Sequence, residues 1–293
     1  MSLDVTDRTA AERTAEAMAL AATAVAAAKA GAEVLQRYFR SGRLEVGIKG
    51  TNDFVTQADR ESEAALVAEI LRRHPDHRIL AEEGTVHDSA TSDLEWVIDP
   101  LDGTTNFLQG LPVWAVSVAC RRGDELLAGV VLDPCGGNLF RAARGGGAFW
   151  NDRPMRVSER PALAGAFLAT GYPFRAHGAL DIYLELFRDV FRHARAIRRC
   201  GAAALDLAYT AAGVYDGFFE FRLSPWDIAA GALLVEEAGG AVSDLDGRPG
   251  YFASGNVLAG CPAVHVGLVA CARECGADED ALDRLVARSP GAD

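Results

Sequence analysis

The feature that most constrains the fold of this chain is an acidic turn that directly follows an apolar segment. Glu95-Trp96-Val97-Ile98 has the composition of a strand, and Asp99 comes immediately after it. Pro100 and Gly103 force the backbone to turn at this point. Asp99 and Asp102 are three residues apart, so their side chains can converge at the carboxyl end of the strand. Hard divalent cations favour such paired carboxylates, and the segment therefore predicts a metal site.

The same segment offers a place for an anion. The backbone carbonyl of Leu101 lies between the two aspartates and can complete the coordination shell of a metal. Gly103-Thr104-Thr105 has the pattern of a starting helical turn, whose exposed N–H groups would suit a phosphate oxygen. The two aspartates could instead only shape the turn. The paired threonines and the acidic clusters elsewhere in the chain favour metal ligands over that simpler interpretation.

Three other acidic clusters lie far from this turn in the sequence. They are residues 53–59, residues 82–84 and residues 225–231. Taken alone, each has a simpler interpretation: Asp59 and Asp227 suit the first turn of a helix, and Glu82-Glu83 suits a solvated turn. Adjacent acids after the apolar pair Ile79-Leu80 are costly, however, unless a cation compensates them. Only the combination of clusters favours a shared metal centre.

Composition narrows the classes of partner. The chain has 293 residues, of which 49% are hydrophobic and 24% charged, as in ordinary globular proteins. Its net charge of -12 should repel nucleic acid and anionic membranes, so a nucleic-acid partner is not expected. An acidic protein that handles an anionic phosphate needs local positive charge, and bound metal cations can supply it.

Other sequence signals favour a cytoplasmic location. The N-terminus lacks the basic start and apolar core of a signal peptide. No uncharged run reaches about 18 apolar residues, so we expect no transmembrane helix and no membrane partner. Six cysteines have irregular spacing without a CxxC pair, and we interpret them as reduced thiols. The six histidines show no zinc spacing, and we interpret them as surface or core residues.

The order of elements predicts an α/β fold with two packed subdomains. An alanine-rich helix is expected over residues 9–39 and a second helix over residues 59–73. Residues 113–150 are rich in strands, and strands alternate with helices after Pro154. We therefore place an N-terminal α+β subdomain at residues 1–152 and a C-terminal α/β subdomain at residues 153–293. The first would carry most metal ligands, and the second would carry Asp227 and the substrate contacts.

These motifs resemble those of the inositol monophosphatase family, within the lithium-sensitive, metal-dependent phosphatase superfamily. The resemblance covers roughly residues 15–275 and is closest to bacterial members. The segments that carry it are GTNDFVTQAD, AEEG, DPLDGTTNF, RRCGAAALD and WDIAAG. It implies a layered αβαβα sandwich of the sugar-phosphatase type, two or three Mg²⁺ ions per site, sensitivity to lithium and a homodimer.

The resemblance also implies roles for individual residues. The implied metal ligands are Glu82, Asp99, the carbonyl of Leu101, Asp102 and Asp227. Glu82, Asp59 and Thr104 are the implied catalytic residues, with Asp59 and Thr104 acting as a pair that helps to activate water. The implied substrate contacts are the phosphate-binding amides of Gly103 and Thr104, and Ala203 and Glu220 near the inositol hydroxyls. Lys49 and Glu83 are additional candidates. The chain departs from the family pattern slightly at Ala81, and also at residues 221–224, which leaves the fine substrate preference open.

We therefore expect Mg²⁺-dependent hydrolysis of a small phosphate monoester, with myo-inositol monophosphate as the leading substrate. Glu220 favours a polyol, since a carboxylate accepts hydrogen bonds from vicinal hydroxyls. Relatives with the same chemistry act on fructose-1,6-bisphosphate, histidinol phosphate or 3'-phosphoadenosine 5'-phosphate. A different class of function also stays open, because some bacterial relatives serve the transcription machinery. The arginines at positions 192, 195, 198 and 199 could then contact RNA or protein, or could form a solvated or dimer-facing strip.

Overall fold

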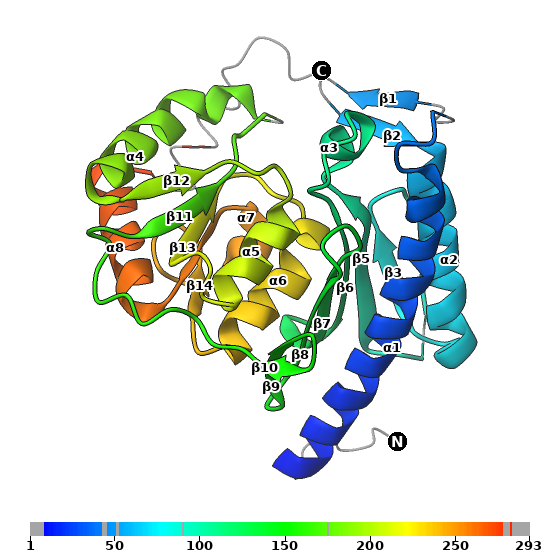
Figure 1. Cartoon of the computed structure of the whole chain (residues 1–293). Coiled ribbons are helices and arrows are strands. Elements are labelled where there is room, and N and C mark those ends of the chain that lie inside the picture. Colours follow the sequence, from blue (N-terminus) through cyan, green and yellow to red (C-terminus); the bar gives the residue numbers. More distant parts are fainter. Residues whose placement is uncertain are drawn as a thin grey trace.

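Five layers of alternating helices and sheets form the molecule (Figure 1). This computed structural model describes residues 9–42, 46–50, 53–89, 91–174, 176–277 and 282. Figure 1 shows helices α1 and α2 outside an eight-stranded sheet, α5 and α6 between that sheet and a five-stranded one, and α4 and α8 outside the second sheet. The expected αβαβα fold class is confirmed.

Helices form the outer and middle layers, and the first two lie close to the ranges that the sequence predicts, residues 9–39 and 59–73. Their bounds are α1 (Ala10–Tyr38), α2 (Gln57–Arg73), α4 (Leu180–His193), α5 (Ala203–Ala211), α6 (Pro225–Glu237) and α8 (Pro262–Glu274). Shorter elements are α3 (Thr104–Leu108), α7 (Tyr251–Ser254), the 3₁₀ turn η2 (His177–Ala179) and a two-stranded ribbon of β1 (Val46–Gly50) and β2 (Asp53–Thr56).

The first sheet has the strand order β10-β9-β8-β7-β6-β5-β3-β4. Its strands are β3 (Arg78–Ala81), β4 (Val86–His87), β5 (Leu94–Asp102), β6 (Ala115–Arg122), β7 (Glu125–Asp133), β8 (Asn138–Ala143), β9 (Gly147–Trp150) and β10 (Arg153–Pro154). β5 is parallel to β3, with Ala81 opposite Ile98, so both strands end at the same edge. That pairing puts the acids after β3 beside the acidic turn of β5.

The second sheet has the order β12-β11-β13-β15-β14. Its strands are β11 (Phe167–Thr170), β12 (Ala196–Arg198), β13 (Gly217–Glu220), β14 (Ala241–Ser243) and β15 (Val257–Gly260). The chain changes sheets between Pro154 and Phe167. The predicted subdomain boundary at residues 152 and 153 stays a prediction, because α6 packs against elements of both halves.

Glycines allow α6 to approach its neighbours closely. A Cβ added to Gly129 of β7 would lie 2.8 Å from the backbone oxygen of Ala230 in α6. A Cβ added to Gly231 would lie 2.4 Å from the Cβ of Leu207 in α5. Since such distances are far below van der Waals contact, any larger residue would push the helix away from its neighbours.

Helix α1 is long and apolar enough to cross a membrane by length and composition, with a mean hydropathy of 1.4 in its most apolar window. In the structure this helix packs against α2 and the first sheet, and 56% of that window is buried inside the molecule. Its small residues allow this packing: a Cβ at Gly31 would lie 2.8 Å from the hydroxyl of Ser62 in α2. The apolar character of α1 therefore reflects its place in the core.

Acid should weaken the packing at the end of α2. Trp96 Nε1 donates a hydrogen bond to His77 Nδ1 at 3.1 Å, and the His74 and His77 rings stack with centroids 4.4 Å apart. Burial lowers the pKa of both imidazoles, and the charge of His74 lowers the pKa of His77 further. The unfolded chain therefore binds protons near pH 6.5, whereas the folded chain resists them until lower pH. We expect the free energy of unfolding to fall as the pH drops below about 6.5.

Urea unfolding of His77→Gln and the unaltered protein at about pH 7.5 and about pH 5.5 checks this prediction. The fall in unfolding free energy should be smaller in the variant. His87→Gln, on the edge strand β4, is the control and should keep the full fall. An equal fall in all three proteins would contradict the assignment.

Candidate active site

The edge where β3 and β5 end brings the first acidic residues together. The Glu82 N–H donates a hydrogen bond to the Ile98 carbonyl at 3.2 Å, which places Glu82 next to Asp99. Strand β5 continues through the acidic turn, with an irregular register between Asp99 and Asp102. Glu82 is half-buried, whereas Asp99 and Asp102 are 1% and 6% exposed. The prediction that the two aspartates converge is consistent with this geometry.

The third aspartate of the cluster, Asp227, comes from the C-terminal half of the chain. Asp227 lies in the first turn of α6, and one of its oxygens accepts a hydrogen bond from the Ser224 N–H at 2.8 Å. This is the helix cap considered from the sequence, and the same carboxylate also faces the acidic turn. Oxygen atoms of Asp99, Asp102 and Asp227 all lie within 4.8 Å of one another.

The electrostatics of this cluster fit a cation. Burial, followed by the charges of Glu82, Asp102 and Asp227, raises the pKa of Asp99 well above its usual value. Burial and Asp227 raise the pKa of Asp102 to about 7, although backbone N–H groups of α5 oppose that rise. Buried carboxylates that repel one another in this way suit a hard divalent cation, which would neutralise them.

A contact at the start of α5 was not predicted from the sequence. The N–H groups of Ala203 and Ala204 donate hydrogen bonds to the two oxygens of Asp102, at 3.1 and 2.8 Å. The positive end of α5 therefore stabilises this carboxylate. Ala203, the implied substrate contact, lines the cavity, but its N–H is directed at Asp102.

The predicted pair Asp59 and Thr104 is brought together across 45 residues of chain. Thr104 Oγ1 lies 3.4 Å from Asp59 Oδ1 and 3.1 Å from the Leu101 carbonyl. The other Asp59 oxygen accepts a hydrogen bond from the Thr56 N–H at 2.9 Å, so Asp59 also caps α2. Both interpretations of Asp59, as a helix cap and as a partner of Thr104, fit the structure.

Glu63, whose role was not predicted from the sequence, fixes the turn that carries Glu82. Glu63 is 3% exposed, and its carboxylate accepts hydrogen bonds from the N–H groups of Glu83 and Thr85, at 2.8 and 3.1 Å. Glu83 does not line the cavity, whereas Glu82 does. Lys49 lies in β1, and its side chain is outside the described residues.

A cavity of about 310 Å³ opens over the carboxylates. The predicted residues that line it are Glu82, Asp99, Leu101, Asp102, Gly103, Thr104, Ala203, Glu220 and Asp227. Gly103 has a φ of 88°, and a Cβ there would lie 3.0 Å from the Val113 carbonyl, so glycine is required at this turn. Residues 221–223, where the chain departs from the family pattern, also line this cavity.

Glu220 forms part of the cavity wall contributed by the second sheet. Burial, with the charges of Asp206 and Asp227, raises the pKa of Glu220 well above its usual value, and Arg199 opposes the rise. Gly171 lies so close that an added Cβ would fall 1.9 Å from a Glu220 oxygen. Asp206 and Arg199 were not assigned to this site from the sequence, although both lie in the RRCGAAALD segment that carries the resemblance.

Comparisons with known proteins agree with this architecture. The sequence model of the inositol monophosphatase family matches residues 16–277. A protein named Nus factor SuhB from Salmonella typhimurium is 46% identical over 85% of this chain and 93% of its own length. An inositol-1-monophosphatase from Mesorhizobium japonicum is 45% identical over 80% of this chain and 88% of its own.

A solved structure gives the same result in three dimensions. The crystal structure of the extragenic suppressor protein SuhB from Bartonella henselae has a TM-score of 0.84 and 42% sequence identity to this chain. It covers 87% of this chain and 99% of its own. Sequence, cavity and fold therefore agree, and the chain belongs to the inositol monophosphatase family.

Proposed function

We propose that this protein is a cytoplasmic, Mg²⁺-dependent phosphatase that hydrolyses myo-inositol monophosphate to inositol and phosphate. The observation that carries the proposal is the trio of buried aspartates at the floor of a cavity with Glu220 in its wall. Family membership supports metal-dependent phosphatase chemistry in general. The choice of inositol monophosphate over other monoesters is the proposed part.

The residues that would hold two or three Mg²⁺ ions are Glu82, Asp99, the Leu101 carbonyl, Asp102 and Asp227. When bound, Mg²⁺ supplies a lowered pKa for water and charge stabilisation of the departing alkoxide. Asp99, Asp102 and Asp227 are already buried and close to one another, so they can share bound cations. The N–H groups of α5 hold Asp102 in one orientation.

The remaining residues orient the attacking water and the phosphate. Thr104 Oγ1 can donate its proton to Asp59 or to the Leu101 carbonyl, which leaves its lone pair free to accept a hydrogen bond from water. Glu82, which also lines the cavity, can accept a hydrogen bond from the other hydrogen of the same water. The backbone N–H groups of Gly103 and Thr104, at the start of α3, would bind phosphate oxygens. No covalent phosphoenzyme is needed.

Truncation of Glu220 tests the proposed substrate. Glu220→Ala should raise KM for myo-inositol monophosphate by about 10- to 150-fold, because loss of a charge-assisted hydrogen bond costs about 1.5–3 kcal/mol. Turnover of p-nitrophenyl phosphate, which has no vicinal hydroxyls, should change little and also shows that the variant is folded. Steady-state kinetics with and without Mg²⁺ measures both quantities.

The unaltered enzyme should also be compared on fructose-1,6-bisphosphate, histidinol phosphate and 3'-phosphoadenosine 5'-phosphate. The highest kcat/KM is expected for inositol monophosphate. Faster turnover of another ester, or an equal loss on p-nitrophenyl phosphate in Glu220→Ala, would overturn the substrate assignment. Release of phosphate from every ester without Mg²⁺ would overturn the proposed mechanism itself.

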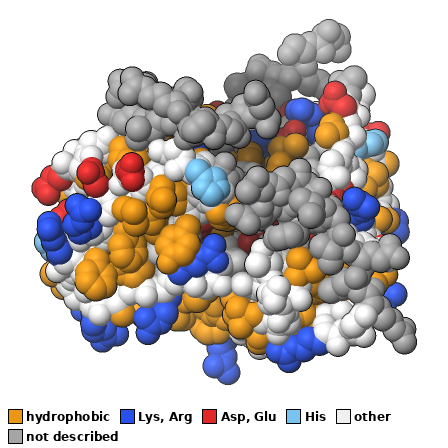
Figure 2. Space-filling model, turned by 90° about the horizontal axis from the view of Figure 1, so that it is seen from above, with side chains coloured by type: hydrophobic (Ala, Val, Ile, Leu, Met, Phe, Trp, Pro, Cys, Tyr) orange, Lys and Arg blue, Asp and Glu red, His pale blue; other side chains and the backbone are white. Residues whose placement is uncertain are grey.

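Two further parts of the proposal, a homodimer and inhibition by lithium, rest on the family. The surface of α4 is compatible with a partner, since Leu180, Leu184 and Phe191 are 44%, 43% and 63% exposed. Figure 2 shows hydrophobic side chains gathered on the side of the molecule where α4 lies, next to Lys and Arg side chains. Sedimentation and an inhibition series with LiCl would test the two expectations.

A second candidate function is a contact with the transcription machinery. Several relatives of this chain are named Nus factor SuhB. These names give no support to the expectation that the protein has no nucleic-acid partner. Arg195, Arg198 and Arg199 are exposed, and the Arg198 and Arg199 guanidinium groups stack on Phe167 and Tyr172, at 5.0 and 5.2 Å from the ring centroids. A basic surface with aromatic partners is suited to RNA.

Filter binding of single-stranded RNA over a salt series tests this second function. If the arginines bind RNA, Arg198→Ala should weaken retention and reduce its salt dependence, whereas Arg153→Ala, on the exposed strand β10, should not. No retention of RNA at low salt, or equal retention by the two variants, would contradict the hypothesis that these arginines bind RNA.

A further inference from the structure

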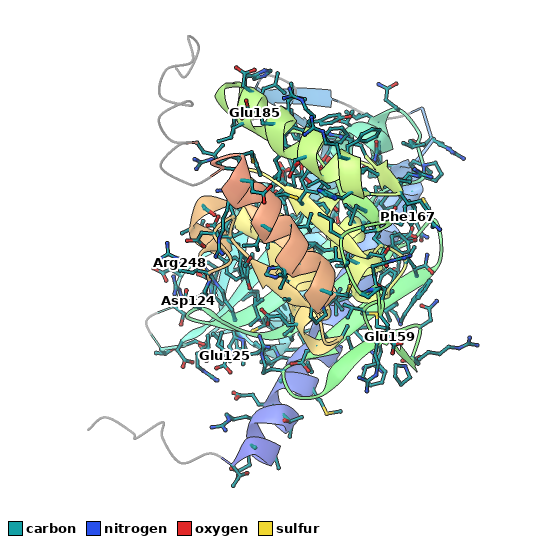
Figure 3. The ribbon with its side chains drawn as sticks, turned by 90° about the vertical axis from the view of Figure 1, so that its left-hand side faces the viewer. Asp124, Glu125, Glu159, Phe167, Glu185 and Arg248 are labelled. Atoms are coloured by element: carbon teal, nitrogen blue, oxygen red, sulfur yellow. The ribbon has the colours of Figure 1, made fainter. Side chains whose placement is uncertain are left out.

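A second group of metal-ligating side chains lies away from the phosphatase cavity, between α4 and α8. Figure 3 shows these helices side by side on the outer face of the second sheet, with Glu185 labelled on α4. Within the described residues, only this group and the three aspartates bring at least three potential ligands together. It consists of Asp189 and His193, one turn apart on α4, and Cys271 on α8.

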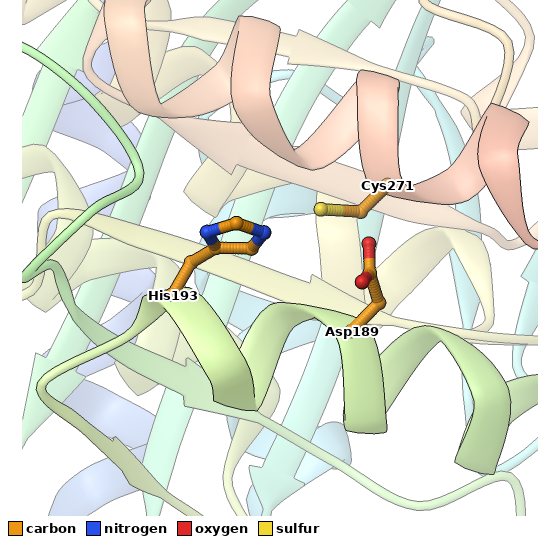
Figure 4. Close-up of side chains that lie close together, drawn as sticks. All are labelled: Asp189, His193 and Cys271. Carbon is orange, nitrogen blue, oxygen red and sulfur yellow. The ribbon is translucent and has the colours of Figure 1, made fainter.

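The side chains of this group converge. One ligand atom from each of Asp189, His193 and Cys271 lies within 4.8 Å of the other two. In Figure 4 the imidazole and the carboxylate extend from α4 toward the Cys271 sulfur, which extends from α8. Tetrahedral zinc needs ligand atoms about 3.5 Å apart, given metal–ligand bonds of about 2.0–2.3 Å. A closure of at most about 1.3 Å, within the reach of side-chain rotations, would bring the group to that geometry.

Burial and access also suit a bound ion. Asp189 Oδ2 is buried without an N–H or O–H donor among the described residues, and the Cys271 thiol, a weak donor, hydrogen-bonds the Asp189 carboxylate. The other Asp189 oxygen lies 3.9 Å from the Arg192 guanidinium, a contact too long to satisfy the carboxylate fully. Cys271 is 4% exposed, whereas His193, at the end of α4, is exposed and leaves a path from solvent. A cation between the helices would give the buried oxygen a stronger partner than the thiol.

A catalytic triad of cysteine, histidine and aspartate does not explain the group. A nucleophilic cysteine needs a lowered pKa and access to substrate. Burial and the neighbouring Asp189 instead raise the pKa of the Cys271 thiol to about 12. The sulfur is also enclosed between two helices, so no substrate carbonyl could approach it.

We propose that Asp189, His193 and Cys271 form a zinc site that ties α4 to α8. A sulfur, a nitrogen and an oxygen ligand favour zinc over magnesium, because hard Mg²⁺ prefers oxygen alone. The site takes three ligands from the protein and leaves the fourth position for water. Binding releases the thiol proton, so affinity rises with pH. The site is separate from the phosphatase centre, whose ligands are all oxygens.

Cobalt is the probe that separates the two centres. Co²⁺ bound by a thiolate gives a near-ultraviolet sulfur-to-metal charge-transfer band, and Co²⁺ bound by carboxylates does not. Co²⁺ added to the reduced, chelator-treated full chain in the presence of excess Mg²⁺, which competes for the carboxylate centre, should produce this band and saturate it at one equivalent. Zn²⁺ should then abolish the band, whereas excess Mg²⁺ should leave it. The band tests the zinc site independently of phosphatase activity.

Variants assign the band to residues. Cys271→Ser should remove the band, and His193→Ala should weaken Co²⁺ binding at least tenfold. Cys135 is an exposed cysteine elsewhere, so Cys135→Ser should keep the band and the Co²⁺ affinity of the unaltered protein. Mg²⁺-dependent turnover and far-UV circular dichroism should be unchanged in Cys271→Ser, which shows that it is folded. No band in the unaltered protein, or an unchanged band in Cys271→Ser, would overturn the proposal.

Discussion

Asp99→Asn should abolish Mg²⁺-dependent phosphate release and at the same time make the metal-free protein more stable. We expect kcat to fall by at least about 10³, which corresponds to a loss of about 4 kcal/mol of transition-state stabilisation. Stability should change in the opposite direction, because burial, together with the charges of three nearby carboxylates, raises the pKa of Asp99 and makes its ionised form costly. An asparagine removes that repulsion and keeps nearly the same shape.

The measurement combines turnover with thermal unfolding in EDTA and in Mg²⁺. The midpoint of Asp99→Asn should be higher than that of the unaltered protein in EDTA, and Mg²⁺ should raise it less. Asp216→Asn is the matched control. Asp216 is also buried, but it accepts a hydrogen bond from the Phe167 N–H at 2.7 Å and pairs with Arg160.

Asp216→Asn should therefore lower stability in both conditions and keep Mg²⁺-dependent turnover. Opposite signs in the two variants would show that the strain belongs to the Asp99 cluster and not to buried aspartates in general. A fully active Asp99→Asn enzyme, or a lower midpoint for it in EDTA, would contradict the metal-ligand role.

Gly255→Ala should destabilise the protein by about 2–5 kcal/mol, through strain and collision together. Gly255 ends α7 with a φ of 73°, and a Cβ there would lie 2.2 Å from the Leu223 carbonyl oxygen. The left-handed conformation alone costs alanine about 1–2 kcal/mol. The collision involves backbone, which cannot rotate away, and adds about 1–3 kcal/mol. Leu223 lines the cavity, so kcat/KM should fall as well.

Gly239→Ala separates the two contributions. Gly239 has a φ of 86°, but a Cβ there would meet nothing within 4 Å. This variant should lose only the conformational part, about 1–2 kcal/mol, and should keep its kinetics. Urea unfolding at neutral pH gives both values. Equal losses in the two variants would mean that the Leu223 contact relaxes without cost.

Much of the acidic centre could be predicted because its residues carry local signals. The turn after β5 contains Asp99, Pro100 and Gly103 in one segment, so the same few residues indicate both the turn and the metal ligand. Asp227 follows Ser224 and Pro225, which mark the start of a helix. The resemblance to a family then linked these distant segments, and no spacing in the sequence could have shown that they meet.

Contacts without a local signal were not predicted. Glu63 lies in the middle of α2, where an acid usually faces solvent, and only the packing of α2 on the first sheet turns it toward Glu83 and Thr85. The α5 amides that hold Asp102 come from a segment about a hundred residues away. His193 and Cys271 have no metal-ligand spacing in sequence, because their approach depends on how α4 and α8 pack over the second sheet.

The close fit of α6 has a consequence for distant variants. Its backbone touches β7 at Gly129 and its Gly231 faces Leu207, so the helix has almost no freedom to slide. Asp227 sits at the tip of this rigid rod. A methyl group added at either glycine would displace α6 as a whole, and this displacement would move the Asp227 carboxylate away from the other metal ligands. Poor cation affinity in an otherwise intact enzyme can thus originate at positions that touch no ligand.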